Sequence, residues 1–377
     1  MTPSITPIVF VGGSRDTTVE RLITDAHEVI ALDLLERLAE SPVFDDPIVA
    51  TSSPRFAAEA QRQSSRVVRD DGDFHFGRIL AELIDRFDVR NAFYLGGGSA
   101  PLLSAEALSH IADLALAEPA SLVANNFYSC DFVAFSPALA IRQIDLPAID
   151  NDLAYRLHHE AGLKNVSLPR SAGTQLDVDT PTDLLILSRY PGIGPGLRRY
   201  LDKANFDTER VRAVGRILTE PTAEIVVAGR VGSYVLAHLE QDVACRTRVF
   251  SEERGMRANR REERGDVRSL LGYHLQTVGP RKFFADLASL GDAIVFDSRV
   301  IFHHLGRNPS ASDRFYSDLL QPDQIEDDFV RAFTEAAAEA TVPVLLGGHS
   351  VVAGGLWALI DAAWLERDRE IEARSTS

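Results

Sequence analysis

The first half of this 377-residue chain alternates short apolar runs with longer amphipathic segments. Apolar runs of strand length separated by segments of helix length are typical of parallel strands joined by crossover helices. The pattern therefore predicts an α/β domain, a mainly parallel sheet with helices on both faces. The expected strands are residues 7–11, 47–51, 91–95, 121–124 and 132–135, and the expected helices are residues 29–39, 76–87, 105–116 and 151–161.

A dense group of turn-forming residues divides the chain. Residues 189–196 contain two Pro and three Gly, which indicates a connection where one unit ends. Strand-like runs return in the second half, with helical segments between them, so we expect two α/β domains. We predict a first domain over residues 1–190, a linker and helical connection over residues 191–222, and a second domain of unknown family over residues 223–377.

Composition and charge exclude several classes of protein. The chain has 55 acidic and 39 basic residues, and its net charge of -16 argues against nucleic acid as a partner. No apolar stretch approaches the ~18 residues of a membrane helix, and the first residues lack a secretory signal, so we expect a cytoplasmic protein without membrane contact. Cys130 and Cys245 have no metal-binding or redox spacing and are expected to be small buried residues. Self-association, as a homo-oligomer, is left open.

Two glycine-rich motifs follow expected strands. Gly12-Gly13-Ser14-Arg15 comes after the first strand, and Gly96-Gly97-Gly98-Ser99 comes after the third. Glycine lets the backbone approach a ligand, and ligands of open α/β sheets bind at the carboxyl ends of the strands. Each motif also has a structural explanation, because the first can be an ordinary strand-to-helix turn and the second leads to a helix capped by Ser104.

A third motif, Asp177-Val178-Asp179-Thr180-Pro181-Thr182-Asp183, places carboxylates just before an expected helix. Thr180 as N-cap, Pro181 in the first turn and Asp183 in a capping box account for its second half without a ligand. Capping explains Asp177 and Asp179 less well. Alternate carboxylates on one extended segment are able to present an oxygen to Mg²⁺.

The order of these three motifs resembles that of the nucleotidyltransferases of the glycosyltransferase-A fold. The molybdenum-cofactor guanylyltransferase-like and phospholactate guanylyltransferase-like enzymes are the most similar groups, and the resemblance covers about residues 5–190. It implies a nucleotide-diphospho-sugar transferase-like fold that binds a nucleoside triphosphate and Mg²⁺. It also implies a phosphorylated small molecule as the acceptor of the nucleoside monophosphate, with release of pyrophosphate.

The resemblance also implies roles for individual residues. The nucleotide-binding positions are Gly12, Gly13, Ser14, Arg15, Gly97, Gly98 and Ser99, and the catalytic positions are Arg15, Asp177 and Asp179, the two carboxylates being the metal ligands. Two departures stand out: residues 16–21 lack the usual lysine, and Ser99 occupies the position of the usual central aspartate. Either Asp177, Asp179 or Asp131 replaces that carboxylate, or the domain binds a nucleotide or sugar phosphate without turning it over.

A polar segment after the fourth expected strand is the candidate acceptor site. Asn125, Asn126 and Asp131 carry hydrogen-bonding groups suited to hydroxyls or phosphate. The alternative is a polar surface loop.

The second half contains other candidates. Residues 246–268 hold eight arginines and five acids, which indicates either a bound anion or a solvated, salt-bridged face. We expect an anion site formed by Arg254, Arg257, His349 and Ser350. A further alternative is a hydrolase-type site that uses Asp297, His303 and His349 at one sheet edge.

Overall fold

The computed structural model describes residues 3–69 and 72–375. It divides into two compact units, and each is built from several pieces of the chain. The first unit contains Met1–Ser14, Thr24–Asp177 and Gly194–Tyr200, and the second contains Arg15–Ile23, Val178–Ile193 and Leu201–Ser377. The division differs from the expected one at residue 190, because the contacts of residues 178–193 assign them to the second unit.

The first unit is built on a seven-stranded sheet in which β6 alone runs antiparallel to its neighbours. The strand order is β3-β2-β1-β4-β6-β5-β7. The strands are β1 (Thr6–Val11), β2 (Ile48–Thr51), β3 (Arg66–Arg69), β4 (Ala92–Gly96), β5 (Ser121–Ala124), β6 (Phe132–Ser136) and β7 (Lys164–Ser167). This confirms the expected mainly parallel sheet and its five strands. The sequence pattern misses β3 and β7, whose polar residues suit the two edges of the sheet.

Helices cover both faces of this sheet, as predicted. One apolar core packs α1 (Thr18–Ala39), α2 (Pro54–Arg62) and α4 (Ala105–Leu116) against the strands. The other core contains α3 (Phe76–Arg86), α5 (Leu153–His159) and the 3-10 helix η1 (Ala138–Gln143). The short helix α6 (Ala172–Gln175) precedes the end of the unit. The expected helix at residues 29–39 is the second half of α1.

The second unit contains a four-stranded parallel sheet in the order β11-β10-β8-β9. Its strands are β8 (Glu224–Gly229), β9 (Arg246–Ser251), β10 (Ala293–Asp297) and β11 (Val344–Gly347). These four strands form the strand-like runs that the sequence predicts for the second half, which confirms a second α/β domain.

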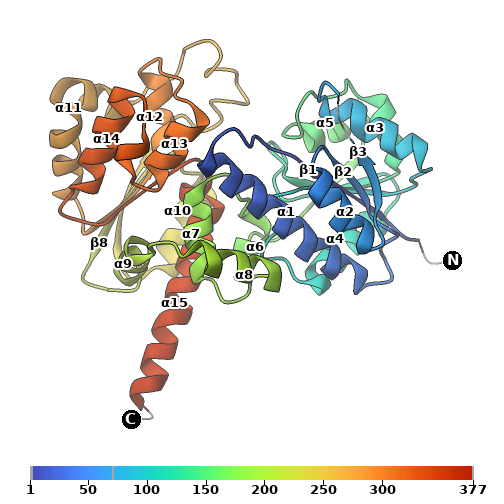
Figure 1. Cartoon of the computed structure of the whole chain (residues 1–377), viewed down its shortest axis with the longest axis horizontal. Helices are drawn as coiled ribbons and strands as arrows, with labels where there is room; N and C mark the ends of the chain where they lie inside the picture. The colour runs from blue at the N-terminus through green and yellow to red at the C-terminus, as the bar shows by residue number, and fades with distance from the viewer. Residues whose placement is uncertain (1–2, 70–71, 376–377) are drawn as a thin grey trace. The chain divides into compact units, whose positions relative to one another are not determined.

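Helices again lie on both faces of the second sheet. One face packs on a phenylalanine-rich core with α11 (Leu270–Ala288), α12 (Ser298–His304) and α14 (Asp328–Ala338), and α13 (Ala311–Asp318) lies beside α14 (Figure 1). On the other face, the sheet packs against α9 (Glu209–Leu218), because side chains alternate between the two faces along each strand. The helix α15 (Gly354–Ser375) in turn packs against α9, α7 (Pro181–Arg189) and α10 (Ser233–Asp242). Figure 1 shows α15 running well beyond its neighbours in this unit.

The connection expected at residues 191–222 consists mostly of two helices, α8 (Pro195–Ala204) and α9. Asn205 adopts a left-handed conformation with φ 49°, which ends α8. The described helices include none with the length and apolar character needed to cross a membrane.

Asp33 of α1 fixes the start of α8 within the first unit. Its two carboxylate oxygens accept hydrogen bonds from the main-chain N–H groups of Gly196 and Leu197, both at 2.8 Å. Asp33 is buried, and a Cβ at residue 196 would lie 2.5 Å from its Oδ1, so glycine is required at this close approach. The first turn of α8 therefore depends on one buried side chain from α1.

Replacing Asp33 by alanine is expected to lower the free energy of unfolding by roughly 2–3 kcal/mol, because two N–H groups lose their acceptors. Urea denaturation of the full chain measures this difference. The exposed Asp113 of α4 serves as the control, and Asp113→Ala is expected to change the free energy by less than about 0.5 kcal/mol. Equal losses in the two variants would contradict the anchoring role.

Candidate functional site

The carboxyl ends of β1, β4 and β5 lie at one edge of the first sheet, because these strands run in the same direction. The loop after β1 contains Gly12, Gly13 and Ser14. The carbonyl of Ser14 accepts a hydrogen bond from the hydroxyl of Thr24 at 2.7 Å. Gly13 has φ 146°, and a Cβ there would lie 2.7 Å from that hydroxyl. The loop is thus held to α1 while its main chain stays exposed at Gly12 and Gly13.

The turn after β4 packs against the end of β1. A Cβ on Gly97 would lie 3.1 Å from the carbonyl oxygen of Phe10, so the two backbones approach closely. Ser99 is buried, and both its N–H and its hydroxyl donate to the carbonyl of Gly96, at 3.1 and 2.8 Å. The Ser99 side chain closes the turn and does not replace the missing carboxylate.

Asp177 is paired with this turn. It forms an isolated antiparallel bridge with Ser99, which places its backbone directly beside the turn after β4. The structure therefore places the backbone of an aspartate beside the turn that contains Ser99. Sequence spacing alone gave no sign of this pairing.

Two other expected site residues belong to the second unit by their contacts. The main-chain N–H of Asp179 donates to Oδ2 of Asp183 at 3.1 Å, within the capping box that begins α7. Arg15 lies in the segment Arg15–Ile23, where its carbonyl accepts from the guanidinium of Arg21 at 2.9 Å.

The expected acceptor residues occupy the loop after β5. Asn125 donates to the Asp131 carboxylate at 2.6 Å and accepts from the Asp131 N–H at 2.9 Å. Asn126 accepts from the N–H of Tyr128 at 3.2 Å. The structure brings Asn125 and Asp131 together, and their mutual hydrogen bonds shape the loop.

An aromatic cluster beside this loop was missed by the sequence analysis. Tyr128 and Tyr155 are exposed, and the ring of Tyr155 lies 4.2 Å from that of His159 and 6.1 Å from that of Tyr128. Phe127 packs on all three rings. The spacing of residues 155 and 159 on one helix face was the available signal, but the loop that completes the cluster comes from elsewhere in the chain.

A second group of functional side chains lies at the carboxyl edge of the second sheet. Arg230 follows β8, and Asp297 ends β10 beside it. The Arg230 guanidinium donates to both carboxylate oxygens of Asp297, at 2.5 and 3.0 Å. Burial opposes ionisation of Asp297, but Arg230, His349 and Arg299 together hold its pKa below the ordinary value.

Histidines lie around this pair, as the hydrolase-type alternative expected. Burial and the nearby Arg230 charge lower the pKa of His349 to about 4, so its ring is neutral at neutral pH. His303 lies 3.4 Å from a Glu262 carboxylate oxygen, and burial lowers its pKa. Asp297 interacts electrostatically with His303 and with His349 at the carboxyl edge of the second sheet. Its carboxylate already forms an ion pair with Arg230.

The expected anion site does not form one cluster. Arg254 is exposed and lies over the Tyr234 ring, 5.9 Å from its centre. Arg257 is exposed and interacts electrostatically with Arg314 of α13. Ser350 hydrogen-bonds with the buried Asp183 instead of facing an anion. Within residues 246–268, ion pairs join Arg248 to Glu224, Arg261 to Glu253 and Arg264 to Asp266, as a salt-bridged face would.

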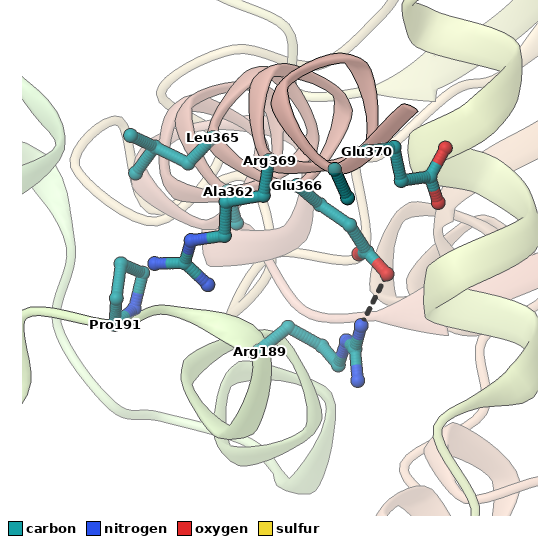
Figure 2. Close-up of a pocket in the computed structure, with 8 residues that line it drawn as sticks. Arg189, Pro191, Ala362, Leu365, Glu366, Arg369 and Glu370 are labelled. Carbon is teal, nitrogen blue, oxygen red and sulfur yellow. Dashed lines mark hydrogen bonds and ion pairs between the residues drawn. The ribbon is translucent and has the colours of Figure 1, made fainter. Parts of the chain in front are cut away.

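A pocket of about 340 Å³ lies elsewhere in the second unit, between the end of α7 and α15. Figure 2 shows Arg189 paired with Glu366, whose Oε1 is 2.5 Å from the guanidinium, with Pro191 and Arg369 on the opposite side. No expected site residue lines this pocket. Across the described parts of the chain, no three His, Cys, Asp or Glu side chains gather in a metal-binding arrangement. Cys130 and Cys245 are buried, as expected, and burial raises the pKa of both thiols.

No protein-family model matches the chain, and no curated protein matches it. Part of the chain is similar to a cytidylyltransferase from Leptospira borgpetersenii, with 15% identity over 54% of this chain and 95% of the other, at a TM-score of 0.39. A 4-diphosphocytidyl-2C-methyl-D-erythritol synthase from Anaerococcus prevotii shares 12% identity over 48% and 92% of the two chains, with a TM-score of 0.35. A CMP:2-keto-3-deoxy-manno-octonic acid synthetase complexed with CTP shares 12% sequence identity, covering 48% of this chain and 95% of the other, and its TM-score is also 0.35. Similarity at this level carries no functional argument.

Asp183 generates a test of the second unit. Burial, and then the nearby Asp179 charge, raise the pKa of this carboxyl to about 7. The folded chain therefore holds a proton that the unfolded chain releases near pH 4, so its contribution to stability is complete at low pH and is lost as the pH rises through 7. Relative to Asp183→Asn, which does not titrate there, the wild type is expected to lose about 2–3 kcal/mol between pH 5 and 8.

Urea denaturation of both proteins at several pH values measures this difference. Asp323→Asn, at an exposed position in the same unit, is expected to follow the wild-type pH dependence. A constant difference between the wild type and Asp183→Asn across this range would show that Asp183 is ionised in the folded state.

Proposed function

We propose that the first unit binds a nucleoside triphosphate at the carboxyl edge of its sheet. We further propose that it transfers the nucleoside monophosphate to a phosphorylated small molecule, with release of pyrophosphate. The observation that carries the proposal is the pairing of Asp177 with Ser99, beside two glycine-rich loops that follow neighbouring parallel strands. In this proposal the loops supply main-chain donors for the phosphates, and Asp177 supplies the carboxylate.

The glycine loops supply the phosphate-binding surface in this proposal. Gly12 and Gly13 are exposed, and the hydrogen bond between Thr24 and Ser14 fixes the loop that contains them. Main-chain N–H groups in such loops bind phosphate oxygens without side-chain obstruction. Arg15, the next residue in the chain, has its contacts in the second unit, so the proposed phosphate-binding surface of the first unit consists of main-chain groups.

Asp177 is the proposed ligand for Mg²⁺. Magnesium in nucleotide sites is commonly held by one or two carboxylates together with substrate phosphates, so one aspartate beside the phosphate loops fits this chemistry. When bound, the ion would offset the negative charge of the phosphates. Asp179, whose contacts lie in the second unit, is not required by this arrangement.

The loop after β5 is the proposed acceptor side. The hydrogen bonds between Asn125 and Asp131 preorganise the loop, and the exposed rings of Tyr128 and Tyr155 add an apolar surface next to it. A phosphate oxygen of the acceptor would attack the α-phosphorus opposite the pyrophosphate leaving group. The contribution of the chain is to align the two substrates and to stabilise charge, since phosphoryl transfer needs little more.

The first test measures binding of each of the four nucleoside triphosphates to the full chain by calorimetry, with and without Mg²⁺. One triphosphate is expected to bind in a Mg²⁺-dependent way. Gly12→Val adds a side chain where a Cβ meets no other atom within 4 Å, and it is expected to weaken this binding at least about tenfold because it obstructs the main-chain donors. If no triphosphate binds, the proposal fails.

The second test measures pyrophosphate release from that triphosphate with a panel of sugar phosphates and other small phosphate esters. Asp177→Asn is expected to keep the fold and reduce release at least about 100-fold, in line with loss of one charge-stabilising group. Asp113→Asn, which changes an exposed carboxylate on α4, is the matched control. Binding without release by the wild type would indicate a non-catalytic nucleotide-binding unit.

A further inference from the structure

Arg37 of α1 holds the segment of chain that follows the turn after β4. Its guanidinium donates to the carbonyl oxygens of Ala100 at 3.3 Å, of Pro101 at 3.5 Å and of Leu103. The Nε group donates to a carbonyl of α1 itself, at 3.1 Å. One side chain therefore ties residues 100–103 to α1 through three main-chain oxygens.

The hydrogen bonds of Arg37 go to main chain and not to a counter-ion. The side chain is partly buried, and it forms no ion pair within the parts of the chain that the structure describes. A guanidinium suits this task, because its N–H donors lie in one rigid plane and several carbonyls can share them. Arg37 therefore fixes the path of the backbone and does not neutralise a carboxylate.

The segment that Arg37 holds contains an unfavourable backbone conformation. Ala100 is buried and has φ 55°, a left-handed conformation that residues with a Cβ rarely adopt. The N–H of Leu103 donates to the Ala100 carbonyl at 3.3 Å, and Arg37 donates to the same oxygen. The guanidinium thus reinforces a turn whose backbone is strained.

Helix α6 connects this segment to Asp177. Gly173 of α6 packs so closely on the segment that a Cβ there would lie 3.0 Å from Cδ2 of Leu103. Asp177 follows α6 by two residues and forms its backbone bridge with Ser99. The chain that leads to Asp177 therefore rests on the segment that Arg37 holds.

We infer that Arg37 is a positioning residue of the candidate nucleotide site. It holds residues 100–103, and through them it fixes Asp177 beside the Ser99 turn. This role rests on the proposed function, because it affects nucleotide binding only where Asp177 is the Mg²⁺ ligand. Arg37 itself contacts neither substrate nor metal in this arrangement.

Hydrogen exchange of the full chain, without nucleotide or Mg²⁺, tests the positioning directly. Arg37→Met removes the donors and keeps an unbranched side chain. It is expected to speed exchange of residues 99–103 and 176–178 at least about tenfold, because both segments lose their anchor. Arg62→Met is the matched control, since Arg62 is exposed on α2 and contacts residues of its own helix. Unchanged exchange of residues 176–178 in Arg37→Met would overturn the inference.

The Mg²⁺ dependence of triphosphate binding, measured by calorimetry, separates positioning from a general loss of stability. In Arg37→Met the half-saturating Mg²⁺ concentration is expected to rise at least about tenfold, as it does when a group that orients a metal ligand is lost. Asp33→Ala weakens the contact of the same helix with α8 and is expected to keep the wild-type value. An equal rise in both variants would overturn the positioning role.

The two measurements distinguish failure of this inference from failure of the proposed function. If the wild type binds no triphosphate, the proposed function fails, while the exchange rates still decide whether Arg37 fixes Asp177. Arg37→Lys covers the case in which Arg37→Met does not fold. It retains the charge but lacks the planar fork, so intermediate exchange rates are expected. Wild-type rates in Arg37→Lys would overturn the role assigned to the guanidinium.

Discussion

The chain must cross back to the starting edge of a sheet before it can form the next parallel strand, and this constraint sets the position of the loops in both units. Every loop that follows a parallel strand is delivered to one edge. In the first unit this edge receives the loops after β1, β4 and β5, and in the second it receives the residues after β8, β10 and β11. The candidate site residues lie at these two edges because the loops that follow parallel strands come together there.

The two edges are built in different ways. The first presents main chain, since glycines at residues 12, 13 and 97 remove side chains where the loops approach each other or solvent. The second presents charge, with Arg230 and Arg299 paired with the buried carboxylates of Asp297 and Asp318. Main-chain donors suit a ligand whose phosphates lie flat along a loop, while guanidinium groups suit a compact anion held at a point.

Much of the fold follows from local patterns in the sequence. Residues 105–116 form α4 as predicted, because the Ser104 side chain accepts from the N–H of Ala107 and fixes the start of the helix. The capping box of Thr180 and Asp183 was predicted in the same way, and it is present. The two edge strands were missed because their polar residues lack the apolar run on which the assignment of strands relied.

The candidate sites were less accessible to sequence reasoning. The glycine motifs were visible, but the pairing of Asp177 with Ser99 depends on a long-range bridge that no spacing encodes. Arg254 looked equivalent to Arg257 in the sequence, and only the structure shows that Arg254 lies over the Tyr234 ring. Asp318 was overlooked because nothing local marks a residue whose role is set by a partner from another element, here Arg299.

The division of the chain into interleaved pieces has a consequence for its synthesis. Residues 194–200 complete the first unit, so the Asp33 carboxylate can accept its two hydrogen bonds only after Gly196 and Leu197 have emerged from the ribosome. The second unit in turn uses residues 15–23 and 178–193, which are made before most of it exists. Neither unit is a contiguous stretch of the chain, so neither can be fully synthesised before part of the other has been made. For the same reason, no single truncation point separates one intact unit from the other.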